Sequence, residues 1–199
     1  MLDLQAHPYD IVIRDIPQAH SSDQIEPAIY SHAITIGDYL FVNKVVEIYR
    51  QGELVSSCLF SSDIGVGAIE HSAVIIGQVC YIAVAQFVFA LELPQLTVQW
   101  RTAVDSSVCF GLYVLPHTDG FITHGEQDIT RLSFSGTTLW SASGNDIFSN
   151  GITIETDRIT AVDFQGERYH IDSTTGEITL IRLKNTCFLD YYGKFKPAG

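Results

Sequence analysis

Short runs of β-branched and aromatic residues recur along the chain, with four runs in each stretch of about forty residues. The last stretch shows the pattern best, because Ile152 and Ile154 alternate there with Thr153 and Glu155. Alternation with a period of two is typical of strands that have one buried face. Thr-Asp, Gln-Gly and Thr-Gly pairs separate the runs and favour tight turns. The pattern therefore predicts antiparallel strands joined by turns.

One of these turns recurs at nearly constant spacing. Its intervals are 43, 41 and 40 positions, marked by Gly52, Gln95, Gly136 and Gly176. A bulky apolar residue keeps a second interval of 40 positions, at Trp100, Trp140 and Leu180. Such spacing predicts an internal repeat. We expect one domain over residues 1–199, with units at about 30–62, 72–105, 107–146 and 149–184.

Each unit is expected to contain four strands. The expected ranges are 33–36, 39–43, 45–49 and 54–60 in the first unit, and 73–76, 79–85, 87–93 and 96–103 in the second. They are 108–115, 120–124, 128–134 and 137–141 in the third, and 151–156, 158–164, 167–172 and 177–182 in the fourth. Residues 2–27 and 186–199 lie outside the units, although a strand at Asp10–Ile13 could complete a sheet edge.

Stacked four-stranded units bury both faces against their neighbours, as the blades of a propeller do. The predicted fold is therefore all-β and propeller-like, with about four four-stranded antiparallel blades. We expect the blades to form a closed or nearly closed ring within one chain. The alternative is a β-sandwich built from the same strands.

Two of the turns resemble a known family. The segment Ile-Asp-Ser-Thr-Thr-Gly-Glu-Ile-Thr-Leu at 171–180 resembles the Asp-x-x-Thr-Gly-x-x-x-Trp turn of quinoprotein-type (PQQ/WD40-like) β-propeller repeats. Residues 132–140 are a second copy, which has the tryptophan but lacks the aspartate. The resemblance covers about residues 33–183 and implies blades that bind other proteins. It implies no cofactor and no catalytic residue here, because the chain has about four units instead of six to eight and lacks a recognisable cofactor constellation.

Charge narrows the possible partners. The chain has 23 acidic and 11 basic residues and a net charge of -12, so its field repels nucleic acids and anionic lipids. We therefore expect no nucleic-acid or membrane partner. A basic protein fits the charge, although the acidity also serves solubility.

Cysteine use and the N-terminal segment predict a cytoplasmic protein. The four cysteines, Cys58, Cys80, Cys109 and Cys187, form no Cys-x-x-Cys pair and are read as reduced thiols, most of them in the core. The first residues show no basic region followed by an apolar run.

The uncharged segment Ser72–Leu91 is long enough to span a bilayer as a helix. It contains Gly77, Gln78 and Gln86 and has no closely flanking Lys or Arg. Two buried strands joined by a turn explain this segment better.

The densest group of polar side chains is His117, Asp119, His124 and Glu126. Imidazole and carboxylate groups together can bind a metal or move a proton. A strand between the two pairs would keep them further apart than metal ligands are, so we expect no metal site. The group is a candidate binding site, and ordinary turn chemistry is the competing interpretation.

Two hypotheses for function follow. The first is a non-catalytic protein–protein interaction module with an acidic surface, one specific version of which is an inhibitor or immunity-type protein that neutralises a basic partner. The second is a small carbohydrate-active hydrolase whose rim would bring together two of five carboxylates: Asp119, Glu126, Asp128, Asp157 and Asp163. The oligomeric state stays open.

Overall fold

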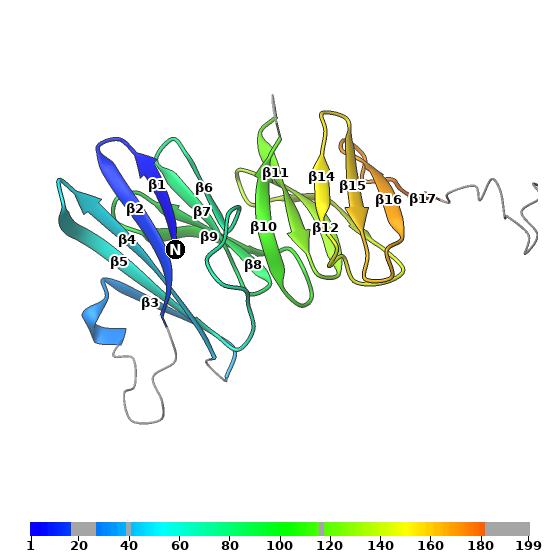
Figure 1. Ribbon diagram of the computed structural model, residues 1–199. Helices are drawn as coiled ribbons and strands as arrows, with labels where there is room; N and C mark the ends of the chain where they lie inside the picture. The colour runs from blue at the N-terminus through cyan, green and yellow to red at the C-terminus, as the bar shows by residue number, and fades with distance from the viewer. Residues whose placement is uncertain (17–26, 39–40, 116–117, 182–199) are drawn as a thin grey trace, which may run out of the picture.

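Four β-sheets lie side by side in the computed structural model, which describes residues 1–16, 27–38, 41–115 and 118–181 (Figure 1). The second sheet contains β6 (Ala73–Ile76), β7 (Val79–Val84), β8 (Phe87–Glu92) and β9 (Thr97–Ala103). The third contains β10 (Cys109–Val114), β11 (Gly120–Gly125), β12 (Asp128–Ser133) and β13 (Thr138–Ser143). The fourth contains β14 (Ile152–Ile154), β15 (Arg158–Val162), β16 (Arg168–Asp172) and β17 (Ile178–Ile181).

These three sheets are four-stranded and antiparallel, and their strands follow one another in chain order. Every strand begins and ends within two residues of the range that the sequence predicts. The all-β fold with blade-like sheets is therefore confirmed.

The first sheet differs from the prediction. It has five strands in the order β1-β2-β4-β5-β3, namely β1 (Leu2–Ala6), β2 (Tyr9–Ile16), β4 (Val42–Arg50), β5 (Glu53–Ser62) and β3 (His32–Ile36). The expected strands 39–43 and 45–49 are wrong as separate elements, because residues 42–43 and 45–49 belong to the single strand β4. The strand expected at Asp10–Ile13 is part of β2, which pairs with β4.

An insertion explains why the first unit differs from the prediction. A short 3₁₀ helix, η1 (Pro27–Ile29), and β3 lie between β2 and β4 in the chain, but β3 pairs in parallel with β5 at the far edge of the sheet. The first two strands in the sheet order, β1 and β2, thus come before residue 30, where the expected unit begins. Parallel pairing across an insertion is non-local, so local periodicity does not reveal it.

Apolar side chains fill each boundary between neighbouring sheets. Sheets 1 and 2 bury Ile48, Phe60, Ile82 and Phe89 between them. Sheets 2 and 3 bury Tyr81, Val88, Leu112, Phe121 and Leu132. Sheets 3 and 4 bury Ile122, Ile129, Phe148, Ile159 and Ile171. The apolar run at 72–91 therefore forms β6, β7 and most of β8 inside this core, and the membrane-helix interpretation is wrong. In the described part of the chain, no helix has the length and apolarity needed to cross a membrane.

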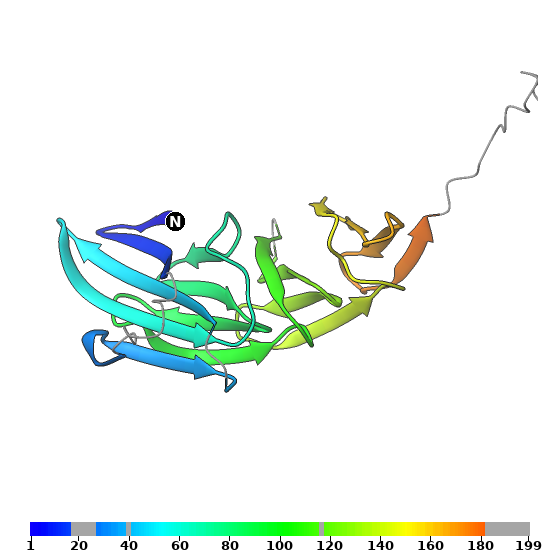
Figure 2. The ribbon, with the colours of Figure 1, turned by 60° about the horizontal axis from the view of Figure 1, so that its bottom comes forward.

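The four sheets of the described residues form an open arc, so the expectation of a closed or nearly closed ring is wrong for this part of the chain. Figure 2 shows sheets 1 and 4 at opposite ends of the arc, with β1, β6, β10 and β14 on its concave side. The sheets follow one another around the arc instead of forming two layers, which also excludes the β-sandwich alternative. The outer face of sheet 4 carries Thr153, Thr160, His170 and Thr179. A polar face of this kind gives little hydrophobic drive for another blade to pack.

A repeated tryptophan contact joins the sheets. The indole Nε1 of Trp100 in β9 donates a hydrogen bond to the Phe134 carbonyl oxygen at 3.2 Å. The Nε1 of Trp140 in β13 donates in the same way to the Ser173 carbonyl oxygen at 3.2 Å. In each case the tryptophan lies on the outermost strand of one sheet and its acceptor lies in the last turn of the next sheet.

A serine takes the tryptophan's place at the first boundary. Ser56 in β5 donates to the Pro94 carbonyl oxygen in the last turn of sheet 2. The strand pairing shifts by one residue just before Ser56, Trp100 and Trp140, which is the signature of a β-bulge. A bulge re-aims the side chain beside it, so the same local irregularity directs all three donors at the next sheet.

Candidate binding surface

The structure separates the sequence-predicted site residues. Asp119 is exposed at the turn before β11, whereas His124 is buried near the other end of the same strand. Five residues of strand span roughly 16 Å. His117 lies outside the described residues. The described members of the predicted group therefore do not form one site, and its binding role stays a prediction.

His124 holds two sheets together. Its Nε2 lies 2.8 Å from the carbonyl oxygen of Phe148, so this nitrogen carries the proton and donates it. Its ring packs edge-on against Phe110 at 5.2 Å between centroids. Burial lowers the pKa of His124, partly offset by the hydrogen bond to Phe148. A buried, neutral imidazole with a backbone partner suits a structural role between sheet 3 and the segment that leads to sheet 4.

Glu126 belongs to a network around the turn between β11 and β12. Its carboxylate accepts a hydrogen bond from the Ser107 hydroxyl. Beside it, the buried carboxylate of Asp105 accepts backbone N–H groups of Ser107, Gln127 and Asp128 at 2.6, 2.9 and 2.8 Å. Burial raises the pKa of Asp105 although these hydrogen bonds lower it. The network ties the loop after β9 to the next sheet.

Sequence reasoning missed Asp105. A Cβ built on Gly125 would stand 2.0 Å from its Oδ2 atom, so the turn accommodates this carboxylate only because residue 125 is glycine. The sequence signal was weak, since the aspartate simply follows a strand and precedes two serines. Its three donors come from positions that are distant in sequence or from an ordinary turn.

The five carboxylates of the hydrolase hypothesis do not gather at one rim. Asp119 and Asp157 follow the first strand of sheets 3 and 4, whereas Glu126 and Asp163 follow the second strand, at the opposite end. Asp128 accepts the Ser143 hydroxyl at 2.5 Å. Asp163 is buried and accepts the Tyr169 hydroxyl and the Glu167 N–H, both at 2.8 Å. Within the described ranges, no group of three His, Cys, Asp or Glu side chains could hold a metal ion.

One end of the arc combines carboxylates with exposed apolar side chains. We define the loop end by the connections between sheets, residues 63–72, 104–108 and 144–151, and by the turns at 126–127 and 163–167. Strand directions place these segments together at the lower edge of Figure 1. None of them contains Lys or Arg. Their exposed or half-buried carboxylates are Asp63, Glu70, Glu126, Asp146 and Glu167.

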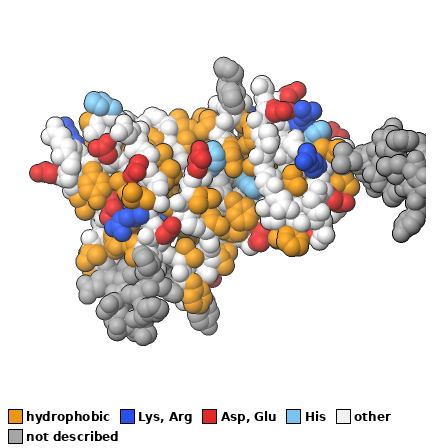
Figure 3. Space-filling model, viewed as in Figure 1, with side chains coloured by type: hydrophobic (Ala, Val, Ile, Leu, Met, Phe, Trp, Pro, Cys, Tyr) orange, Lys and Arg blue, Asp and Glu red, His pale blue; other side chains and the backbone are white. Residues whose placement is uncertain are grey.

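Three apolar side chains of the loop end face solvent. Ile64, Ile69 and Phe164 are 38%, 51% and 63% exposed. Below sheets 3 and 4 in Figure 3, carboxylates lie beside hydrophobic side chains. Exposed apolar groups ringed by one sign of charge are typical of surfaces that bind other proteins.

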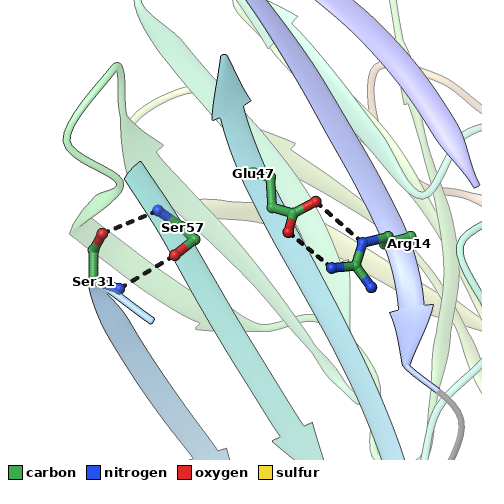
Figure 4. Close-up of polar contacts among 4 residues, drawn as sticks. All are labelled: Arg14, Ser31, Glu47 and Ser57. Atoms are coloured by element: carbon green, nitrogen blue, oxygen red, sulfur yellow. Dashed lines mark hydrogen bonds and ion pairs between the residues drawn. The ribbon is translucent and has the colours of Figure 1, made fainter. Parts of the chain in front are cut away.

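A second polar feature lies on the outer face of sheet 1. Arg14 and Glu47 form a paired hydrogen bond there, with N–O distances of 3.1 and 2.8 Å. Ser31 and Ser57 exchange hydrogen bonds between backbone N–H and side-chain oxygen at 3.3 and 3.1 Å (Figure 4). The hydrogen bonds that Arg14 donates to the Glu47 carboxylate raise the pKa of Arg14. The Nε and Nη2 atoms of Arg14 are thus already paired, and the same face also carries the buried apolar side chains of Val45 and Leu59.

The three cysteines that the structure describes belong to the core. Cys58, Cys80 and Cys109 are buried and free, and burial raises the pKa of each to about 12. Thiolates are the reactive form, so these three cysteines serve the core. Cys187 lies outside the described residues.

Comparison with known proteins shows the fold of the chain but not its family. No protein-family model matches it, and no curated protein matches its sequence. Among solved structures, the β-propeller protein BamB from Moraxella catarrhalis is similar, with a TM-score of 0.51 and 12% sequence identity. The match covers 69% of this chain and 44% of the BamB chain, so this chain spans less than half the length of that protein. The chain thus has a propeller-type fold, built as a four-sheet arc.

Proposed function

We propose that the chain is a non-catalytic protein-binding module whose loop end binds a basic protein. The observation that carries this proposal is the exposure of Ile64, Ile69 and Phe164 among carboxylates in loops that lack Lys and Arg. Apolar contacts supply affinity when they are desolvated, and the surrounding charge steers a cationic partner and excludes anionic ones. The net charge of -12 acts in the same direction.

In this proposal, the packed sheets hold the binding loops in fixed positions. Three apolar boundaries and the repeated donors Ser56, Trp100 and Trp140 hold the sheets, so loops from different sheets keep fixed positions relative to one another. A preorganised surface loses little conformational entropy on binding. An inhibitor or immunity-type protein that neutralises a basic toxin or nuclease is the specific version of this role. The free, buried thiols support a cytoplasmic location.

Affinity purification with the full chain as bait tests the proposal. We expect a stoichiometric basic partner that salt releases, and we expect the double variant Ile69→Ser/Phe164→Ser to lose it. The matched control is Val98→Ser/Leu139→Ser, which alters exposed apolar residues on the outermost strands β9 and β13. Recovery of the same partner by the loop-end variant, or loss with the control only, would contradict the proposal.

A further inference from the structure

One asparagine of the loop end stands directly before a glycine. Asn150–Gly151 ends the connection that leads from sheet 3 to β14 (Figure 1), and both residues are exposed. It is the only Asn-Gly pair in the chain. Asn145 lies in the same connection and is exposed as well, but Asp146 follows it, whereas Asn43 is buried within β4. The two asparagines of this connection thus share their surroundings in the chain but differ in the residue that comes next.

The Asn150 side chain holds the turn between β15 and β16. Its carboxamide Nδ2 donates hydrogen bonds to the carbonyl oxygens of Asp163 at 2.7 Å and Phe164 at 3.2 Å. The backbone adds two more links, because Asn150 N–H donates to the Val162 oxygen at 3.1 Å and Val162 N–H donates to the Gly151 oxygen at 3.0 Å. The connection and the end of β15 are therefore tied both by the backbone and by a carboxamide nitrogen.

The turn that Asn150 holds carries Phe164, which is 63% exposed. The Phe164 N–H donates to the Ile147 carbonyl oxygen at 2.8 Å, so the turn receives a second tie from the same connection. On its other side, the buried Asp163 accepts the Tyr169 hydroxyl at 2.8 Å. The carboxamide of Asn150 is therefore the link between the connection and the turn that chemistry at a single side chain can remove.

Asparagine followed by glycine undergoes deamidation, a reaction that consumes only water. The Gly151 nitrogen attacks Cγ of Asn150 and gives up its proton, the Cγ–Nδ2 bond breaks, and ammonia leaves as the backbone closes into a succinimide. Water then opens this ring at either carbonyl and yields aspartate or isoaspartate. A residue without Cβ favours the attack because its backbone reaches the required conformation easily. Gly151 has a φ of +103° and nothing within 4 Å of a built Cβ, so the surroundings leave room for the ring.

We propose that Asn150 is a deamidation site and that its conversion releases the turn that carries Phe164. An aspartate carboxylate accepts hydrogen bonds but donates none, so at residue 150 it would repel the carbonyl oxygens of Asp163 and Phe164. Isoaspartate also lengthens the backbone by a carbon atom, which disrupts the paired hydrogen bonds with Val162. The new negative charge joins loops that contain no Lys or Arg. Deamidation thus converts a fixed turn into a loosened one.

Timed incubation of the full chain at mildly alkaline pH tests the modification. Peptide mapping by mass spectrometry separates the asparaginyl, aspartyl and isoaspartyl forms of each peptide. We expect Asn150 to convert at least about tenfold faster than Asn145, the internal control in the same connection, and to yield both products. Conversion of Asn150 that is absent, or no faster than that of Asn145, would overturn the assignment of the site.

Hydrogen exchange of the Phe164 N–H measures the release of the turn. We expect Asn150→Asp, which carries the carboxylate product, to lower the protection of this amide about tenfold or more. The matched control is Asn150→Ala, which removes the same donors without adding a charge and should lower the protection less. The amides of sheet 2 should keep their protection in both variants, which shows that the chain is folded. Unchanged protection of Phe164 in Asn150→Asp, or an equal loss in the two variants, would overturn the proposed release by the carboxylate.

Discussion

The indole ring of Trp140 lies against the backbone of Gly176 in the next sheet. A Cβ atom built on Gly176 would stand 2.7 Å from the indole Cδ2 atom, and the same relation holds between Trp100 and Gly136. The regular spacing of the glycines and that of the tryptophans in the sequence therefore have one cause, because each tryptophan packs on a glycine of the next sheet. The regular recurrence of this contact is what makes the arc a repeat of blades.

Replacing Gly176 with alanine should destabilise the chain by about 3 kcal/mol. The new methyl group would meet the ring of Trp140, and the backbone φ of +75° is unfavourable for alanine. The matched control is Gly166→Ala, because Gly166 has a φ of +82° and nothing within 4 Å of the built Cβ. We expect only about 1 kcal/mol there. Equal losses in urea unfolding would argue against the tryptophan contact.

Asp105→Asn should lower the free energy of unfolding by about 2 kcal/mol, since an amide cannot accept all three backbone donors. Relief of the buried charge offsets part of the loss, because burial raises the pKa of Asp105. Asp128→Asn removes a half-buried carboxylate from the same turn and should cost under about 1 kcal/mol. Chemical denaturation of the two variants measures the difference, and the reverse order would refute the turn network.

Lys44→Met should leave the chain unchanged or stabilise it by about 1 kcal/mol. The Lys44 side chain in β4 is 2% exposed, and its ammonium makes one long hydrogen bond, to the Ala83 carbonyl oxygen at 3.4 Å. Burial lowers the pKa of Lys44, so the folded state holds fewer protons than the unfolded chain near that pKa. Wild-type stability should therefore rise relative to Lys44→Met as the pH increases toward 10. A large loss at neutral pH would show that the ammonium has a stabilising partner.

His124 should make stability depend on pH between about 7 and 5. Burial lowers its pKa in the folded state, so the unfolded chain binds more protons once the pH falls below the unfolded value of about 6.5. The free energy of unfolding should then decline with falling pH, by at most about 1.4 kcal/mol per pH unit from this group. His124→Gln should flatten the decline in urea titrations at pH 7, 6 and 5. Parallel curves would exclude a buried neutral imidazole.

Sheets 2 to 4 could be predicted from the sequence because their strands are consecutive and their turns are short. The first sheet could not, since β3 is inserted between β2 and β4 and pairs with β5. The predicted strands 39–43 and 45–49 left Lys44 as a break between them. In the structure Lys44 and Asn43 are both buried within β4, where Asn43 accepts the Ser61 hydroxyl.

Curvature and the site were harder to predict. Strand content alone does not predict whether a ring of blades closes. The polar residues Thr160 and His170 in the last unit are the sequence feature that relates to this question, because they make the outer face of sheet 4 polar. His124 and Glu126 looked functional because imidazole and carboxylate are reactive groups. Their partners, the Phe148 carbonyl and the Ser107 hydroxyl, come from neighbouring loops that only the fold brings close.

Proton–proton nuclear Overhauser effects from the two indole rings test the blade architecture most directly. We expect contacts from Trp100 to the Gly136 α-protons and from Trp140 to the Gly176 α-protons, with ring-current shifts on both glycines. The observed contacts should pair each tryptophan with the sheet that follows it. Absence of both contacts, or a contact between Trp100 and Gly176, would contradict the stacked arc of blades.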